Sequence, residues 1–248
     1  MSIEVPLEQL QGVVEEVAAD LLAEGGLLAP PVDAFALADR LGLAVARDGW
    51  GASRARLVRL AGGGGAPRPA ILVADDPRPE RRQWAVAHEI GENAAHRVFA
   101  ALGLDPHHAP TGARETIANH LAGSLLLPRE WLVDAGAACD WDLTELKSAF
   151  ATASHELLAR RMLEMPPPVI VTLVDQGRPV WRRSNVLPRA PRLSDAELAA
   201  WRTAHQRTAA VACAPEQLPP GVADVRAWAI HEPHWRREIV RTQLEELW

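Results

Sequence analysis

The chain has 248 residues, of which 48% are hydrophobic and 23% are charged. This composition is that of a globular protein and excludes a mostly disordered or fibrous chain. The 26 lysines and arginines are outnumbered by 32 aspartates and glutamates, so the formal net charge is −6. That balance does not favour the basic surface that a general nucleic-acid-coating protein needs, and we expect no direct nucleic-acid binding.

Neither a membrane span nor a secretory leader is expected. No apolar run approaches the ~20 residues of a transmembrane helix, and residues 1–5 lack the basic-then-apolar order of a signal peptide. The two cysteines, Cys139 and Cys213, form neither a CxxC pair nor a disulfide framework, which is typical of a reducing compartment. We therefore expect a cytoplasmic protein.

Apolar spacing and Gly or Pro breaks predict the elements of the first third of the chain. We expect helices at 7–22 and 33–41 and strands at 43–45, 54–60 and 70–73. The last two strands would form a β-hairpin around the glycines at 62–65. From Pro79 to Met165 the pattern is almost entirely helical, with a loop at 104–112.

Pro166, Pro167 and Pro168 mark the strongest break in the chain. Beyond them we expect β-type runs at 169–174 and 179–182 and helices at 194–205 and 233–247, on either side of an apolar run at 225–230. We assign 1–165 to one domain, including a helical pair at 142–164, and 169–248 to a smaller α+β domain of unknown role. The whole chain is then of the α+β class.

One helical segment carries residues suited to chemistry, His88-Glu89-Ile90-Gly91-Glu92. Residues four apart on a helix lie about 40° apart around its axis and one turn apart along it, so His88 and Glu92 can face a common ion beside Glu89. This is the arrangement of the HExxH zinc helix with Glu92 in place of the second histidine. The alternative is that Glu92 is a solvated carboxylate paired with Arg97 or His96.

A second helical segment follows at 114–128, Arg-Glu-Thr-Ile-Ala-Asn-His-Leu-Ala-Gly-Ser-Leu-Leu-Leu-Pro. The two segments together resemble the ImmA/IrrE family of metallopeptidases, which pair a helical HExxH with a downstream E-x-x-A-N-x-hydrophobic-A-x-x-L-L-x-P helix. The resemblance covers about residues 10–165. It implies a helical, zincin-like peptidase core with a small N-terminal β-hairpin or sheet.

The resemblance also implies roles for individual residues. His88 matches the family's first metal ligand, Glu89 its general base and Glu115 its third ligand, while Glu92 occupies the position of the second histidine. His96 matches a supporting histidine. It lies ~12 Å along the helix from His88, too far to replace the missing ligand.

Ligand chemistry narrows the choice of ion. Two carboxylates place more negative charge on the ion than one, which makes Zn²⁺ a weaker Lewis acid and shifts preference toward Mn²⁺ or Fe²⁺. We expect Zn²⁺ first, with Mn²⁺ or Fe²⁺ as alternatives, or a site without metal. Because the chain has no tyrosine, the groups left to steady an oxyanion or support the ligands are histidines and an asparagine: His96, His107, His108, Asn119 and His120. We interpret His107 and His108 as an exposed loop and Asn119 as a partner of backbone or of a ligand.

Two functions from different classes follow from the resemblance. The first is a metal-dependent endopeptidase, a hydrolase that cleaves a DNA-binding helix-turn-helix repressor in a stress-response or mobile-element switch. The alternative is a non-catalytic module that captures a repressor or partner because its metal site is degenerate. A ligand-sensing role for residues 169–248 is a third hypothesis.

Two further motifs have simpler interpretations. The helix-turn-helix appearance of 143–163 is better explained by packing against the metal helices, because the second helix carries charges of both signs. The run His231-Glu232-Pro233-His234 resembles a metal cluster, but Pro233 at a helix start explains it as capping and turn chemistry.

Overall fold

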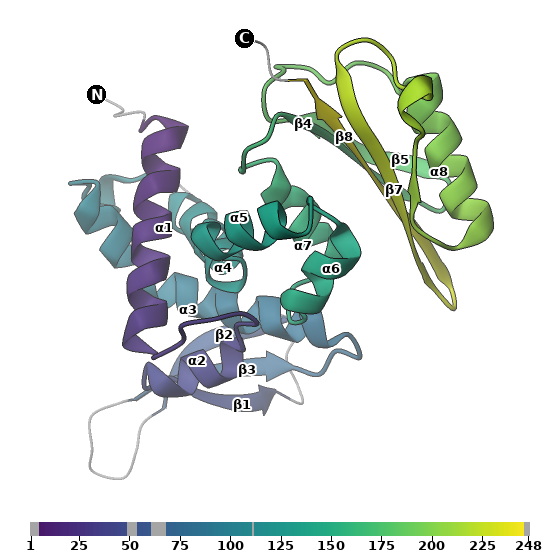
Figure 1. Cartoon of the computed structure of the whole chain (residues 1–248). Coiled ribbons are helices and arrows are strands. Elements are labelled where there is room, and N and C mark those ends of the chain that lie inside the picture. The colour runs from purple at the N-terminus through teal and green to yellow at the C-terminus, as the bar shows by residue number, and fades with distance from the viewer. Residues whose placement is uncertain (1–4, 49–53, 61–67, 111, 246–248) are drawn as a thin grey trace. The chain divides into compact units, whose positions relative to one another are not determined.

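The computed structural model describes residues 5–48, 54–60, 68–110 and 112–245. The chain divides into two compact units, with 1–141 and 146–154 in unit 1 and 142–145 and 155–248 in unit 2 (Figure 1). Helices and strands occur in both units, which confirms the predicted α+β class. The division into domains at 1–165 and 169–248 stays a prediction.

Unit 1 is built around two helices that pack along each other, α3 and α4 (Figure 1). The Glu15 carboxylate of α1 accepts a hydrogen bond from the Ser124 hydroxyl of α4 at 2.8 Å, and the Asp33 carboxylate caps α2 by accepting from the Phe35 N–H at 2.9 Å. The helices of this part of the chain are α1 (Leu7–Glu24), α2 (Ala34–Arg40), α3 (Pro79–Ala101), α4 (Ala113–Leu126), α5 (Arg129–Ala138) and α6 (Leu143–Ala149), the last of which is shared between the two units.

A three-stranded sheet in the order β1-β3-β2 completes unit 1. Its strands are β1 (Ala44–Asp48), β2 (Ala55–Leu60) and β3 (Arg68–Ala74). The antiparallel β2–β3 pair confirms the predicted hairpin strands, while the glycine loop at 62–65 lies outside the described residues. β1 runs parallel to β3, a pairing that local sequence did not indicate. β2 is therefore an edge strand.

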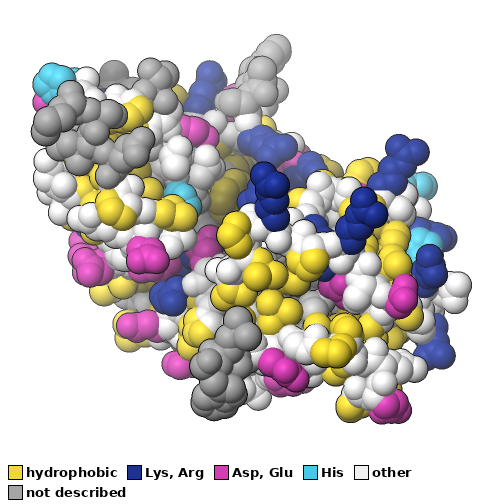
Figure 2. Space-filling model, turned by 90° about the horizontal axis from the view of Figure 1, so that it is seen from above, with side chains coloured by type: hydrophobic (Ala, Val, Ile, Leu, Met, Phe, Trp, Pro, Cys, Tyr) yellow, Lys and Arg dark blue, Asp and Glu magenta, His cyan; other side chains and the backbone are white. Residues whose placement is uncertain are grey.

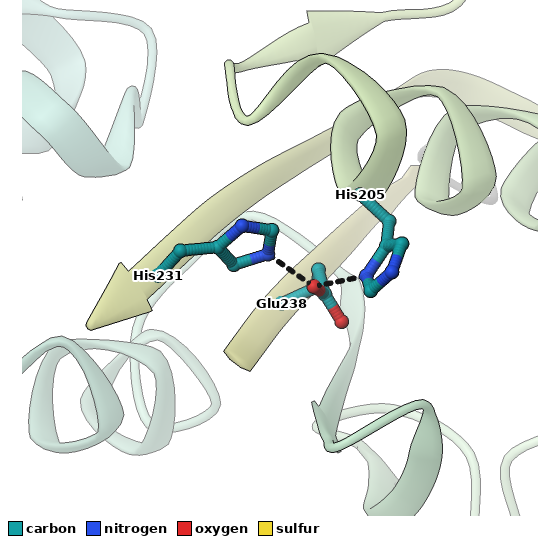
Figure 3. Close-up of side chains that lie close together, drawn as sticks. All are labelled: His205, His231 and Glu238. Carbon is teal, nitrogen blue, oxygen red and sulfur yellow. Dashed lines mark hydrogen bonds and ion pairs between the residues drawn. The ribbon is translucent and has the colours of Figure 1, made fainter. Parts of the chain in front are cut away.

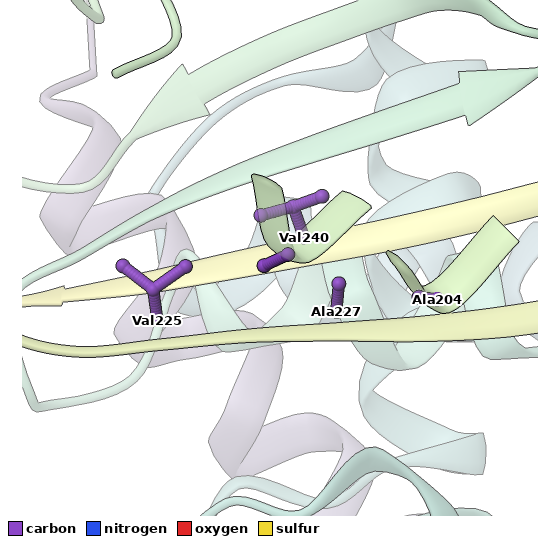
Figure 4. Close-up of a cluster of buried hydrophobic side chains, with 5 residues drawn as sticks. Ala204, Val225, Ala227 and Val240 are labelled. Carbon is purple, nitrogen blue, oxygen red and sulfur yellow. The ribbon is translucent and has the colours of Figure 1, made fainter. Parts of the chain in front are cut away.

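Unit 2 is a five-stranded antiparallel sheet in the order β5-β4-β8-β7-β6, with α8 packed on β7 and β8 (Figure 1). Ser194 and Glu197 form a capping box at the start of α8 and so account for the predicted helix there. The elements are α7 (His155–Met162), β4 (Val169–Asp175), β5 (Arg178–Ser184), α8 (Asp195–Arg207), β6 (Val211–Ala212), β7 (Val222–Glu232) and β8 (Trp235–Leu244). Figure 4 shows part of the core between α8 and the sheet, which consists of Ala200, Ala204, Val225, Ala227 and Val240.

The predicted helix at 233–247 is wrong, because most of this segment is strand β8. β8 lies between β4 and β7, and Ile239, Val240 and Thr242 are buried. The charged Glu238 and Arg241 side chains are also buried in the sheet. β4 pairs with β8 from Arg237 to Gln243 and β7 pairs with it from Trp235 to Leu244, and this tertiary pairing overrides local helix propensity.

The surface carries both signs of charge. On the face shown in Figure 2, basic and acidic side chains both occur, with hydrophobic side chains between them. Within the described part of the chain, no helix has the length and apolar character that crossing a bilayer requires.

Candidate metal centre

Helix α3 carries three of the predicted site residues on neighbouring turns. His88 and Glu92 are half-buried, and Glu89 between them is buried. Pro79 at the first helical position starts the helix. Ala85, Val86 and Ile90 bury its apolar face, which holds the three polar side chains in a fixed direction.

Gly91 lets α4 approach the motif closely. A Cβ atom at this position would lie 2.7 Å from the Ala118 carbonyl oxygen of α4 and 3.2 Å from the Leu121 Cβ. Glycine in a helix interior costs about 1 kcal/mol relative to alanine, and here it gains a backbone-to-backbone contact that no larger residue allows. This close crossing brings Glu115, one turn before Ala118, to the motif on α3.

The structure brings the three predicted ligands together. One ligand atom each of His88, Glu92 and Glu115 lies within 4.8 Å of the others, and His88 Nε2 is 3.5 Å from Glu115 Oε2. Asn119, one turn further along α4, donates from Nδ2 to Glu115 Oε1 at 3.1 Å. One imidazole and two carboxylates so arranged fit a divalent ion, and the asparagine orients the exposed carboxylate for that role.

Glu92 is paired with Arg114, which the sequence did not indicate. Arg114 Nε donates to Glu92 Oε2 at 2.6 Å, and Arg114 Nη2 donates to the Glu92 backbone oxygen at 2.9 Å. The alternative partners named from sequence are wrong: Arg97 pairs with Glu24, and the His96 ring contacts the Asn93 carbonyl oxygen at 2.9 Å. Arg114 directly precedes Glu115. The close contact of α3 and α4 that places Glu115 near His88 therefore also places the Arg114 guanidinium beside Glu92, where it competes with a metal ion for the carboxylate.

Glu89 has the environment of a proton acceptor. Burial, the largest influence, raises the pKa of its carboxyl group, and the neighbouring carboxylates Glu92 and Glu115 add to the rise. His88 and a hydrogen bond from the Leu57 backbone N–H act in the opposite direction but are smaller in sum. Leu57 belongs to β2, so the edge strand lies directly beside the Glu89 carboxylate.

The remaining predicted residues lie outside this group of ligand atoms. His96 is exposed, and His120 is half-buried on α4. His107 and His108 lie exposed in a short 3-10 helix, where the Asp105 carboxylate accepts from the His107 N–H and contacts the His108 ring. This agrees with the exposed-loop interpretation of both residues. Roles for His96 and His120 in oxyanion stabilisation stay predictions.

The positions of the ligand side chains, the Glu89 carboxylate and β2 are suited to a hydrolysis reaction. The ligand atoms of three side chains lie within 4.8 Å of one another beside a buried carboxylate of raised pKa, and β2, an edge strand of the described sheet, borders that carboxylate. A carboxylate with a raised pKa holds a proton more readily at neutral pH, as a general base requires. Helix spacing predicted that His88 and Glu92 face a common point beside Glu89, and the family resemblance added Glu115 and the role of Glu89. Only the fold placed Arg114 and the Leu57 N–H against them.

Comparisons with known proteins identify the fold and the family of the chain. A solved structure described as a Mycobacterium tuberculosis transcriptional regulator is similar in fold, with a TM-score of 0.64 at 19% sequence identity over 97% of this chain and 81% of that chain. No curated protein matches the sequence. The model of the IrrE N-terminal-like domain, Peptidase M78, matches residues 38–162, just over half of the chain. The chain therefore belongs to this family, the ImmA/IrrE metallopeptidases.

Proposed function

We propose that this chain is a metal-dependent endopeptidase of the cytoplasm that cleaves a helix-turn-helix transcriptional repressor in a stress-response or mobile-element switch. The observation that carries the proposal is the buried Glu89 carboxylate, which lies beside the ligand group His88, Glu92 and Glu115 and beside β2, an edge strand of the described sheet. Membership of a peptidase family supports the same reaction class.

His88, Glu92 and Glu115 would hold the ion. A divalent ion in that position supplies Lewis-acid activation of the water and of the peptide carbonyl. Zn²⁺ is the first choice, and the two oxygen ligands also suit Mn²⁺ or Fe²⁺. Asn119 keeps Glu115 turned toward His88, which reduces the reorganisation that binding requires.

Glu89 would act as the general base and then as the general acid. Its burial holds the pKa above the ordinary value, so the carboxylate accepts a proton from the attacking water more readily than an exposed glutamate does. The same carboxyl group then passes the proton to the leaving amine. The Leu57 N–H of β2 donates to the same carboxylate.

The substrate would bind as an added strand. β2 is an edge strand, and Leu57 within it contacts Glu89, so an extended peptide paired with β2 would pass the general base. The net charge of −6 favours a basic partner, and DNA-binding proteins are typically basic. These two features support a repressor as the substrate.

A second function is favoured by the Glu92–Arg114 ion pair. If Glu92 stays paired with the Arg114 guanidinium, only His88 and Glu115 remain as ligands for the ion. The fold would then serve as a non-catalytic module that captures the partner without cutting it. Metal content at the unit 1 site separates the two functions: if the chain is the peptidase, His88→Ala should lower bound metal by one ion per chain, whereas if it is the binding module, His88→Ala should leave bound metal unchanged.

The test compares the wild-type chain with Glu89→Gln in native-host cells that lack their own copy. New protein N-termini identified by mass spectrometry should include a cut within a helix-turn-helix protein, absent with Glu89→Gln although that variant still binds metal at His88 and Glu115. Glu130→Gln, an exposed carboxylate on α5, is the matched control and should cut normally. Retained cleavage by the Glu89→Gln variant would refute the assignment of Glu89 as the general base. Co-purification with an uncut repressor, together with a metal content that His88→Ala does not change, would establish the binding module.

A further inference from the structure

A second group of metal-ligand side chains lies in unit 2, away from the peptidase motif in sequence. His205 comes from the last turn of α8, His231 from β7 and Glu238 from β8, and all three point toward one another (Figure 3). His205 Nδ1 lies 2.8 Å and His231 Nε2 lies 2.6 Å from the same oxygen, Glu238 Oε1. One ligand atom from each residue lies within 4.8 Å of the other two.

The carboxylate of this group is fully buried. The Glu238 side chain is 0% exposed, compared with 11% for His231 and 33% for His205. Its second oxygen, Oε2, accepts a hydrogen bond from the Trp201 indole N–H at 3.1 Å. The indole fixes the orientation of the carboxylate and leaves Oε1 to the histidines. A buried carboxylate requires a cation or several donors, and an ion between the three side chains would meet that requirement.

Metal binding requires each imidazole to lose the proton on the nitrogen that binds the ion, and the groups near the two rings are compatible with that loss. The Thr208 hydroxyl lies 3.3 Å from His231 Nδ1, and a hydroxyl can either donate to that nitrogen or accept from it. When Nε2 binds an ion, Nδ1–H can therefore donate to Thr208. Arg236 Nη1 lies 3.4 Å from His205 Nε2. Metal binding through Nδ1 leaves the ring proton on Nε2, so Arg236 has to move away from that nitrogen. The Arg236 side chain is exposed and can turn to solvent.

The three side chains of this group are held by regular elements, the helix α8 and the strands β7 and β8. Glu238 pairs with Ala229 in the β7–β8 register, and His231 lies two residues beyond Ala229 on the same face. Trp201 and His205 are one turn apart on α8, which packs against that face. The buried core of α8 and the sheet holds the helix in place beside the hairpin (Figure 4).

We propose that unit 2 binds one divalent transition-metal ion of the Zn²⁺ class through His205 Nδ1, His231 Nε2 and Glu238 Oε1. Tetrahedral ligands at ~2.1 Å from an ion are about 3.4 Å apart, so each histidine nitrogen needs to move less than ~1 Å away from Glu238 Oε1 to admit the ion. The partly exposed His205 side leaves a fourth position for water. The bound ion joins α8 to the β7–β8 hairpin, so occupancy stabilises unit 2.

The test uses the full chain with His88→Ala and Glu115→Ala, which removes the candidate site in unit 1. Equilibrium dialysis with Zn²⁺ should give one ion per chain, and Co²⁺ should give the visible absorption of a tetrahedral site. Adding His205→Gln should weaken zinc affinity by more than about 100-fold, since loss of an outer partner alone costs 10- to 100-fold. His234→Gln, an exposed histidine in the same hairpin, is the matched control and should leave affinity unchanged.

Thermal unfolding supplies the second readout. Zn²⁺ should raise the Tm of the protein with an intact His205 and have no effect on the His205→Gln protein. Should the latter lack the circular dichroism of the folded chain, Glu238→Gln replaces it in both measurements. No bound ion in the protein that lacks the unit 1 site, or affinity that is the same with and without His205, would overturn the proposal.

Discussion

Replacing Arg114 with glutamine should strengthen metal binding in unit 1. Arg114 Nε and Glu92 Oε2 are 2.6 Å apart, and the two side chains are 61% and 23% exposed. An exposed ion pair of this kind contributes about 0.2–1 kcal/mol, so its removal should raise the zinc affinity of the His88–Glu92–Glu115 site by roughly 1.4- to 5-fold. Arg114→Gln also removes a positive charge next to the ion, which acts in the same direction.

A double-mutant cycle isolates the contribution of the ion pair. Glu92→His creates the two-histidine motif, releases position 92 from Arg114 and should itself tighten zinc binding. In that background Arg114→Gln has no ion pair left to break, so its effect should be smaller by the same 1.4- to 5-fold, again as a rough value. Zinc affinity is measured by competition with a chromogenic chelator, with His205→Gln in every variant to silence unit 2.

The outcomes distinguish three arrangements. An unchanged affinity in Arg114→Gln, together with no effect of Glu92→His, would place Glu92 outside the coordination sphere and refute the three-ligand site. An equal gain in both backgrounds would assign the effect to charge alone. Arg81→Gln removes an exposed arginine from the start of α3 and is the matched control for a change of net charge.

Two further predictions concern stability. Gly91→Ala places a Cβ 2.7 Å from the Ala118 carbonyl oxygen, so the α3–α4 crossing should open, with a loss of about 1–3 kcal/mol in urea unfolding and weaker metal binding in unit 1. Glu197 is buried, which opposes ionisation, but hydrogen bonds from Thr242, the Ser194 backbone and Arg182 outweigh burial and lower the pKa of its carboxyl group. A lowered folded pKa adds stability that is complete above the ordinary value of 4.5 and is lost as the pH falls through the folded value. Glu197→Gln should cost about 1–3 kcal/mol near neutral pH and reduce the acid dependence of the unfolding midpoint.

Matched variants control for both changes. A Cβ at Gly12, inside α1, would meet nothing within 4 Å, so Gly12→Ala should stabilise the chain by up to about 1 kcal/mol through helix propensity. Equal losses at both glycines would contradict the close-contact explanation. Glu216→Gln removes an exposed carboxylate and should leave the pH profile unchanged. A Glu197→Gln profile identical to wild type would show that this carboxyl group does not contribute to acid unfolding.

Local patterns determined much of unit 1. Apolar spacing located α1 and α3, and alternation with a glycine-rich turn located β2 and β3. The spacing of His88, Glu89 and Glu92 on one helix follows from 3.6 residues per turn alone. Such features depend on residues within a few positions of one another, so no knowledge of the fold was needed to predict them.

Tertiary contacts decided the rest. Glu92 and Arg114 are 22 residues apart, and their ion pair exists only because Gly91 lets α3 and α4 cross closely. The segment 233–247 was predicted as a helix, but most of it is strand β8, because β4 and β7 pair with its two edges.

Tertiary structure also decided the conformation of the segment 231–234. Its neighbours in sequence suggested a capped helix start, whereas Pro233 and His234 connect β7 to β8 in a hairpin. That hairpin and the end of α8 bring the side chains of His231 and His205 to one oxygen atom of Glu238, Oε1. By itself the sequence determined which side chains able to bind metal are present and which lie one helical turn apart. Which of them meet was decided by strand pairing and helix packing, because burial of the shared apolar faces, not local propensity, sets those contacts.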